Sequence, residues 1–337
     1  MNNFVAILII VSFAILVFYG TKLKKFNLNY LSLDNSKSIK TICALTVMLH
    51  HITNYVNCGL LFLPFQVSGY LMVAVFFFYS GYGIMFSLEH KTGYIENFLR
   101  KRLFGLLIPY FIANAIYILI KSFFGKINIQ YLINSFILGT PVVNNSWFII
   151  SLAILYLFFW LSFRWTKNRK ISWLIFLLLF SIYFLNFKFV YWSPAIITFL
   201  LGMLWSCEKN YIDKILARHN ISILILIAVL FLIFFALKVK FSSGAIEAVC
   251  SIFCSLFFVS FVICLQTRVI LGNFALYCLY KISFEIYLYH GLSIYLLKHL
   301  NLFESNCYSF LLTVVISTII ISIIVNKFNK LILSKIQ

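Results

Sequence analysis

The sequence predicts an all-α polytopic membrane protein with about eleven transmembrane helices, and three observations support this fold class. The first is composition, since 63% of the 337 residues are hydrophobic and only 10% are charged, against about 45–50% apolar residues in soluble domains. The second is the length of the apolar runs, and the third is the distribution of the basic residues. The composition alone excludes a water-soluble protein.

The apolar runs have the length of membrane-spanning helices. A helix needs about 20 mostly apolar residues to cross a hydrocarbon core about 30 Å thick. The runs are continuous rather than alternating in polarity, which argues against a β-barrel. We expect helices near residues 3–20, 39–57, 65–88, 103–124, 146–163, 171–187, 189–206, 221–237, 245–265, 282–299 and 308–325.

The net charge of +19 suggests nucleic-acid binding at first sight, but the basic residues are placed as in a membrane protein. With the amino terminus outside, the segments expected on the inner side hold all but six of the 27 Lys and Arg residues. This asymmetry follows the positive-inside rule. It predicts a multi-pass protein of the cell membrane with a cytoplasmic carboxyl terminus, and no nucleic-acid partner. The six residues expected on the outer side are Lys121, Lys126, Lys188, Lys238, Lys240 and Lys298.

The expected organisation is an anchor helix followed by one transmembrane domain. Positive charge follows the first apolar run at Lys22, Lys24 and Lys25, opposite to a cleaved signal peptide. Residues 1–37 are therefore interpreted as a retained anchor helix with a basic cytoplasmic loop, and residues 38–337 as the main domain. The longest expected loops, 21–38 and 125–145, are too short for a soluble domain. Any chemistry must lie among the helices.

Ionisable residues at membrane depth are costly and are functional candidates by default. Lys40 and His51 lie eleven residues apart in one expected helix. This spacing is about three turns, which puts both side chains on one face with roughly 16 Å of axial rise between them. Histidine suits a general base near neutral pH. His50 points about 100° away around the helix, and the spacing alone allows either histidine as the base.

Five short strings follow one another in the sequence. They are Lys40 to His51, Phe76-Phe77-Phe78-Tyr79-Ser80-Gly81-Tyr82, Phe98-Leu99-Arg100-Lys101-Arg102 with Pro109-Tyr110, Ser146-Trp147-Phe148, and Ile286-Tyr287-Leu288-Tyr289-His290. In this order they resemble motifs of the acyltransferase-3 family of integral membrane acyltransferases. These are a basic residue eleven positions before the essential histidine, an FF-x-x-SGY helix end, an arginine-rich loop with a following proline, a tryptophan at a helix start, and YL-x-H. Gly105 departs from the pattern, since many members carry a second arginine there.

The resemblance implies a ten-helix acyltransferase-3-like core preceded by one helix. It also implies transfer of an acyl group, with acetyl the expected one, from acyl-coenzyme A to a hydroxyl of a cell-envelope glycan or lipid-linked sugar. His51 takes the place of the catalytic histidine, with His50 as the alternative. No cofactor is expected to be bound permanently. Residues expected to contact the coenzyme are Lys40, Arg100, Lys101 and Arg102, and those expected to line the substrate channel are Ser80, Gly81, Trp147, Glu285, Tyr287 and His290.

Each of these assignments has a plainer interpretation. The Arg100–Arg102 cluster resembles an ordinary positive-inside loop, Ser80-Gly81 a helix-packing pair, and Trp147 an interfacial residue. The residues of the YL-x-H region could form hydrogen bonds inside the bundle. The histidines lack the paired ligands that a metal site needs, so no metal is expected.

Two other functions share the expected features of the chain. A flippase or transporter of lipid-linked or amphipathic saccharides would have a similar helix count and basic inner face. A non-catalytic partner in an envelope-synthesis complex is the third possibility. Transfer of an acyl group by the purified protein would distinguish an acyltransferase from a flippase and from a non-catalytic partner.

Overall fold

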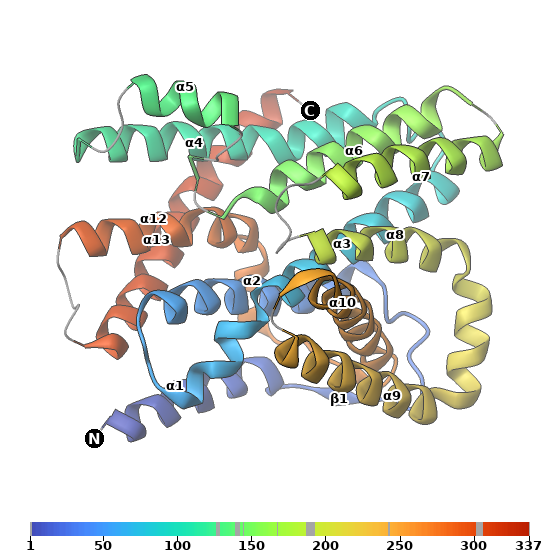
Figure 1. Cartoon of the computed structure of the whole chain (residues 1–337), viewed down its shortest axis with the longest axis horizontal. Helices are drawn as coiled ribbons and strands as arrows, with labels where there is room; N and C mark the ends of the chain where they lie inside the picture. The colour runs from blue at the N-terminus through green and yellow to red at the C-terminus, as the bar shows by residue number, and fades with distance from the viewer. Residues whose placement is uncertain are drawn as a thin grey trace. The chain divides into compact units, whose positions relative to one another are not determined.

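The computed structural model describes residues 2–125, 129–138, 142–143, 145–166, 168–186, 193–241, 243–300 and 306–336, and these are mostly helical (Figure 1). Each of the eleven expected segments contains a helix. Within the described part of the chain, seven helices are long and apolar enough to cross a membrane, and the apolar helices at Phe4–Phe18 and Pro194–Cys207 are shorter. The fold is that of an all-α multi-pass membrane protein, while eleven crossings stay a prediction. Lys126, Lys188 and residues 189–192 lie outside the described residues.

The elements follow in this order. The helices are α1 (Asn2–Phe18), α2 (Leu33–Tyr55), η1 (Leu60–Phe62), α3 (Leu63–His90), η2 (Leu99–Leu103), α4 (Phe104–Phe123), α5 (Ile129–Leu138), α6 (Trp147–Arg164), α7 (Arg169–Asn186), α8 (Ser193–Cys207), α9 (Lys209–Lys240), α10 (Gly244–Gln266), α11 (Phe274–Tyr280), α12 (Ser283–His299) and α13 (Cys307–Ile336). The strands β1 (Lys22–Leu23) and β2 (Val269–Ile270) form an antiparallel pair.

Several boundaries differ from those expected, for one physical reason. The helix α9 begins twelve residues before the expected position 221, and α13 continues to Ile336. Charged residues interrupt the apolar runs at these ends, yet they are compatible with helical backbone when the helix leaves the membrane. A bend at His219, with φ −126° and ψ 25°, separates the two parts of α9. The short helices α5 and α11 and the strand pair lie where only loops were expected.

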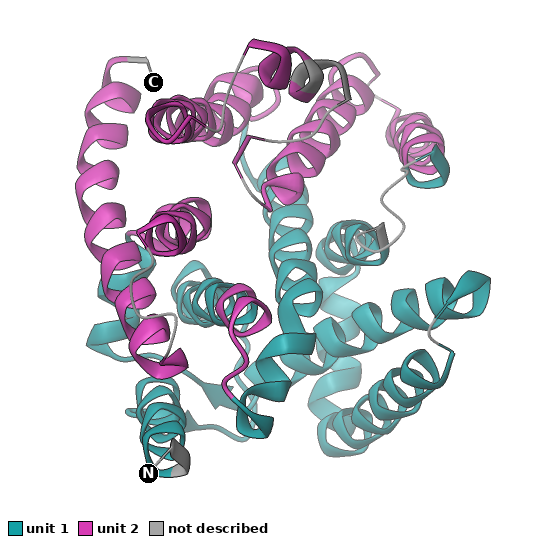
Figure 2. Cartoon of the chain, turned by 60° about the vertical axis from the view of Figure 1, so that its left-hand side comes forward, with its two compact units in different colours: residues 1–50, 59–92, 184–281 teal, residues 51–58, 93–183, 282–337 magenta. Residues whose placement is uncertain are grey.

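The chain separates into two compact units (Figure 2). Unit 1 comprises residues 1–50, 59–92 and 184–281, and unit 2 comprises residues 51–58, 93–183 and 282–337. The helix α2 contributes to unit 1 up to His50 and to unit 2 from His51 onward. The two neighbouring histidines therefore belong to different units.

In unit 1, α3 and α8 approach closely at two glycines. A Cβ atom on Gly81 would overlap the carbonyl oxygen of Phe199, and one on Gly202 would overlap that of Phe78. Between the same helices, Thr198 Oγ1 donates to the Ala74 carbonyl oxygen over 2.6 Å. Small residues let helix backbones approach in membrane proteins, where packing drives association. Both glycines thus serve as contact points between these helices.

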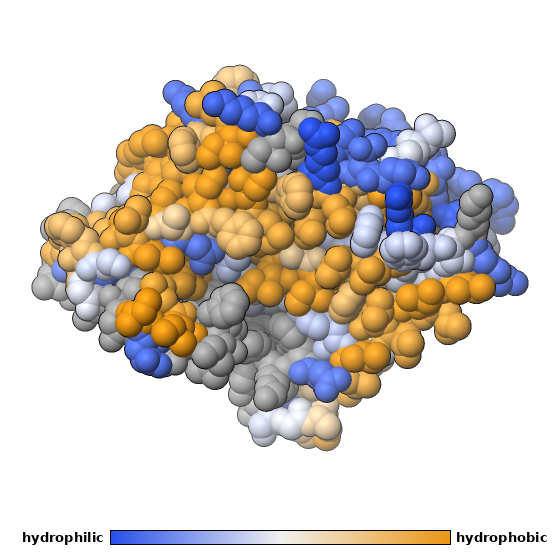
Figure 3. Space-filling view, turned by 90° about the horizontal axis from the view of Figure 1, so that it is seen from above, coloured by the Kyte–Doolittle hydropathy of each residue, from blue (hydrophilic) through white to orange (hydrophobic). Residues whose placement is uncertain are grey.

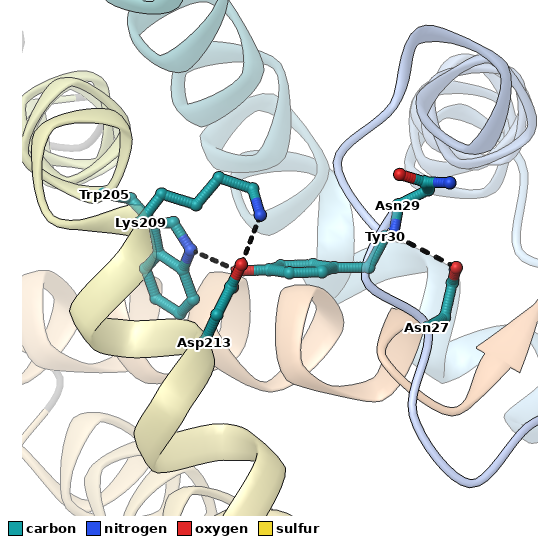
Figure 4. A network of polar contacts seen from close by, with 6 residues as sticks. All are labelled: Asn27, Asn29, Tyr30, Trp205, Lys209 and Asp213. Atoms are coloured by element: carbon teal, nitrogen blue, oxygen red, sulfur yellow. Dashed lines mark hydrogen bonds and ion pairs between the residues drawn. The ribbon is translucent and has the colours of Figure 1, made fainter.

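The segment before α2 is tied to α9 by a buried tyrosine (Figure 4). Tyr30 Oη donates to Asp213 Oδ1 over 2.8 Å and accepts from Trp205 Nε1 over 2.9 Å. Lys209 forms an ion pair with the same carboxylate and lies over the Tyr30 ring. Burial raises the pKa of Tyr30 above its ordinary value, so the phenol stays protonated. This network fixes the start of α2 within unit 1.

In unit 2, the consecutive helices α12 and α13 pack antiparallel. Asn329 Nδ2, near the end of α13, donates over 3.0 Å to Glu285 Oε1 in the first turn of α12. The buried residues of α13, among them Phe310, Val314 and Asn329, recur every three to four positions and so form one face of the helix. Polar pairs of this kind hold membrane helices in register.

The surface is rich in exposed apolar side chains, as the face in Figure 3 shows. On α9, Ile225, Leu232 and Val239 are exposed, and on α7 Leu174 and Leu185 are exposed. In a soluble protein such area would mark binding surfaces. On helices of membrane-spanning length it is the surface expected against lipid tails.

Candidate active site

Two imidazoles stack in unit 2. The rings of His51, at the end of α2, and His290, in α12, have centroids 5.0 Å apart and planes 14° from parallel. His290 is fully buried, whereas His51 is half-buried. The family motifs proposed these residues separately, and the structure brings them together.

An irregular segment before α6 lies against His51. Asn145 Nδ2 is 3.3 Å from His51 Nδ1, and Asn145 has a left-handed backbone with φ 63°. Asparagine adopts this conformation more readily than most residues. Tyr287 Oη donates to the Asn145 carbonyl oxygen over 2.7 Å, and Ser146 Oγ is 3.2 Å from Tyr110 Oη. The helices α4 and α12 thus hold Asn145 in place.

The hydrogen bonds decide which imidazole nitrogen carries a hydrogen. His290 Nδ1 is 3.1 Å from the Ile286 carbonyl oxygen, and because a carbonyl only accepts, Nδ1 carries the hydrogen and Nε2 of the neutral ring has the lone pair. The Asn145 amide nitrogen only donates, so in this orientation His51 Nδ1 accepts. Half a turn of the amide would present Oδ1, and His51 Nδ1 would then donate. At this contact the tautomer of His51 depends on which end of the Asn145 amide faces Nδ1.

His50 has different surroundings, within unit 1. Its Nδ1 donates to the Phe65 carbonyl oxygen over 3.0 Å. The ring fills the space above Gly69, where a Cβ atom would overlap it. His50 thus packs at the contact of α2 and α3, and the assignment of the base to His51, with His50 as the alternative, stays a prediction.

The basic cluster lies on the π-helical turn η2 in unit 2. The side chains of Arg100, Lys101 and Arg102 are exposed, and Arg102 Nε donates to Tyr94 Oη over 3.1 Å. Phe98, just before the turn, is fully buried against Tyr156, with ring centroids 5.6 Å apart. A buried aromatic anchor with exposed cations beside it can present positive charge to an anionic ligand.

Residues 30–327, nearly the whole chain, match a family model described as an acyltransferase domain, that of the acyltransferase-3 family. The chain belongs to the acyltransferase-3 family. The membership predicted from the five strings is confirmed, and the protein is a membrane acyltransferase. No curated protein and no solved structure matches the chain.

Three of the other site residues predicted for this acyltransferase, Lys40, Ser80 and Gly81, lie in unit 1. Lys40, in unit 1, has its Nζ 5.0 Å from the centre of the Tyr79 ring. Ser80 donates to the Phe76 carbonyl oxygen within α3, where Gly81 packs on α8. The SGY string therefore lies inside α3, which continues to His90, and not at a helix end. A channel role for these residues stays a prediction.

Trp147 and Glu285 both lie in unit 2, where they belong to different helix contacts. Trp147 is the half-buried first residue of α6, and the next residue, Phe148, packs its ring edge-on to Tyr287 with centroids 5.5 Å apart. Glu285 is buried and accepts from Asn329. Tyr287 thus joins α6 to the segment that contacts His51, whereas Glu285 joins α12 to α13.

The motifs in the sequence did not point to Asn145, a polar neighbour of His51. It lies in the stretch 125–145 that was expected to be a loop, one residue before the Ser-Trp-Phe string. Its position next to that string could have marked Asn145 as a candidate site residue. Its contact with His51, however, depends on backbone geometry that sequence spacing does not reveal. The acyltransferase therefore has an Asn–His–His cluster at hydrogen-bonding and stacking distance, which is suited to moving a proton.

Proposed function

We propose that this acyltransferase moves an acetyl group from acetyl-coenzyme A to a hydroxyl of a cell-envelope glycan or related acceptor, with His51 as the general base. The observation that supports this proposal is the His51 imidazole, fixed between the Asn145 side chain and the His290 ring. A positioned imidazole beside a polar partner that sets its tautomer is the arrangement general-base catalysis needs.

The proposed step is direct transfer. His51 Nε2 takes the proton of the acceptor hydroxyl while the oxygen attacks the thioester carbonyl carbon. The carbon–sulfur bond then breaks, the acetyl ester forms, and the coenzyme thiolate takes the proton from the His51 imidazolium. This step requires the state in which Asn145 Oδ1 accepts from His51 Nδ1, because only then does Nε2 have the lone pair. Nucleophilic attack by His51 on the thioester is the variant that the experiments below separate.

Donor binding is assigned to basic residues. Arg100, Lys101 and Arg102 are exposed on η2, and guanidinium groups bind phosphate through paired, charge-assisted hydrogen bonds. Lys40 is proposed as a further contact to the coenzyme phosphates, on the basis of the family resemblance. The residues proposed for the acceptor path are Ser80, Gly81, Trp147, Glu285, Tyr287 and His290. Their support is the family pattern, together with the contacts of Tyr287 with His290 and of His290 with His51.

The proposed membrane orientation follows the loop charges. The amino terminus lies outside and the carboxyl terminus inside, so acetyl-coenzyme A enters from the cytoplasm. The acceptor is a glycan or lipid-linked sugar of the envelope, and separate envelope-synthesis proteins are its expected suppliers.

The test uses the full chain purified in detergent. Incubation with acetyl-coenzyme A and a set of envelope glycans should give acetylated product and free coenzyme. His51→Ala should slow the formation of both by at least about 100-fold while the protein level stays unchanged. Retained transfer in His51→Ala would contradict the base assignment. Absence of any transfer by the unmodified chain, with saccharide movement across vesicles, would favour the flippase. Mass spectrometry of envelope glycans from a deletion strain and its parent identifies the acceptor.

A further inference from the structure

Lys121, near the carboxyl end of α4, is a buried lysine to which the proposed reaction gives no role. Its exposed fraction is only 6%, which is rare for lysine unless the ammonium group is bound. Its Nζ donates to the Val142 carbonyl oxygen over 2.8 Å. The rings of Tyr117 and Tyr295 lie on it as well, with centroids 5.5 and 5.7 Å from Nζ.

These contacts offset the cost of burying a charge. An ammonium group out of water is stabilised by hydrogen bonds to carbonyl oxygens and by the negative faces of aromatic rings. Tyr117 is itself held by α12, since its Oη donates to the Leu288 carbonyl oxygen over 2.9 Å. The position of Lys121 is therefore fixed by two helices, and the Val142 carbonyl is fixed to it.

Val142 begins the pre-α6 segment, whose described residues are Val142, Val143, Asn145 and Ser146. Val143 is buried, and its carbonyl oxygen accepts from the Ser146 amide over 3.4 Å. This bond closes a turn that contains Asn145, whose side chain contacts His51. The segment is attached at its start by Lys121, at Asn145 by Tyr287, and at its end by Tyr110.

We infer that Lys121 is a positioning residue of the acyltransferase: by binding the Val142 carbonyl it fixes the pre-α6 segment and thereby holds Asn145 against His51. This inference rests on the proposed function of His51. The hydrogen bond of Lys121 is to a backbone carbonyl of the segment, so the proposed effect on His51 passes through that backbone. It should change the rate of the chemical step and leave donor binding unchanged, since a misplacement of about 1 Å at a catalytic group can lower a rate about 100-fold.

The variants are Lys121→Met, Lys121→Arg and a control, Lys298→Met. Lys298 belongs to the same unit and also lies over a tyrosine ring, with Nζ 5.0 Å from the centre of Tyr55, so its described contact is with α2. Lys121→Met should lower kcat about tenfold or more with KM for acetyl-coenzyme A within about twofold. Lys121→Arg keeps a donor and should recover part of the loss. Lys298→Met should leave kcat unchanged.

A double-mutant cycle separates positioning from general damage. If Lys121 acts through Asn145, adding Lys121→Met to Asn145→Leu should lower kcat by less than about threefold, because the contact is already lost. Full multiplication of the two effects would overturn the inference. Lys298→Met combined with Asn145→Leu gives the reference for independent sites.

Hydrogen exchange of peptides covering Val142 to Ser146 tests the attachment without any activity. Lys121→Met should raise exchange in this segment, whereas Lys298→Met should leave it unchanged. Unchanged exchange in Lys121→Met would overturn the inference even if the reaction is as proposed. Raised exchange in a chain that transfers no acetyl group would instead count against the proposed function and leave the attachment of the segment demonstrated.

Discussion

The imidazole of His51 lies over that of His290, with ring centroids 5.0 Å apart and planes 14° from parallel. The two histidines come from α2 and α12, 239 positions apart in the sequence. The carbonyl oxygen of Ile286 orients the His290 ring and the Asn145 side chain orients the His51 ring. Two imidazoles, each with its own hydrogen-bond partner at Nδ1, are therefore in stacking contact.

The first prediction ranks the three histidines near the end of α2 and in α12. His51→Ala should lower kcat by about 100- to 10,000-fold, the range for loss of a general base. His290→Ala should have a smaller effect, because it removes a neighbour and not the base. His50→Ala should leave kcat unchanged, since His50 packs over Gly69. Initial rates of acetyl transfer by purified protein give the ranking, and a larger loss in His290→Ala than in His51→Ala would move the base to α12.

The second prediction concerns which side-chain atom of Asn145, Oδ1 or Nδ2, forms the hydrogen bond with His51 Nδ1. Asn145→Asp supplies an oxygen that accepts from His51 Nδ1, which keeps the lone pair on Nε2. Asn145→Leu removes the polar contact at similar volume. Transfer should therefore be retained within about tenfold in Asn145→Asp and fall about 100-fold in Asn145→Leu. Equal rates in the two variants would show that the tautomer of His51 is set by another group.

The third prediction concerns the exposed cations on η2. Replacing Arg100 and Arg102 together with glutamine should raise KM for acetyl-coenzyme A about tenfold and leave kcat unchanged, because charge-assisted hydrogen bonds to the donor phosphates are lost. Raised salt should weaken donor binding in the unmodified chain and much less in the variant. Arg164, which pairs with Glu96 in the same unit, is the control position. An unchanged KM would remove the cluster from the donor site.

The fourth prediction separates packing from channel lining at Gly81. Gly81→Ala would place a methyl group against the Phe199 carbonyl of α8 and should destabilise the protein by about 1–3 kcal/mol, as overpacking does. Gly83 lies in the same helix, and a Cβ atom there meets open space. Gly83→Ala should therefore be neutral, or stabilising by up to about 1 kcal/mol. Thermal unfolding in detergent measures both, and a normal melting temperature with lost transfer in Gly81→Ala would support the channel assignment instead.

The membrane fold could be predicted because its cause is local. Twenty apolar residues in a row are sufficient to define a crossing, and the segments at α3, α4 and α10 were found within a few residues of their bounds. The first part of α9 was missed because it is amphipathic, with charged residues between Ile212 and Leu216. The length of an apolar run therefore identifies the part of a helix that lies in the membrane, but not the parts of the same helix that continue outside it.

The candidate site could be predicted only in part. A histidine at membrane depth stands out by its cost, which drew attention to His51, and the YL-x-H string pointed to His290. Their contact could not be predicted, because it depends on how α2 and α12 pack. The bond of Lys121 to the Val142 carbonyl and the left-handed backbone of Asn145 leave no spacing pattern that a single sequence reveals.

The last prediction tests whether Glu285 holds helices or serves the substrate. Its Oε1 accepts from Asn329 Nδ2 over 3.0 Å, and both side chains are buried. Glu285→Gln keeps an accepting oxygen and a similar volume, so the melting temperature should change little. Asn329→Leu leaves the buried carboxyl group without this donor, which should cost about 1–3 kcal/mol. A normal melting temperature with a raised KM for the acceptor in Glu285→Gln would assign the residue to the substrate path. Loss of stability in Asn329→Leu with unchanged KM would assign the pair to the α12–α13 contact.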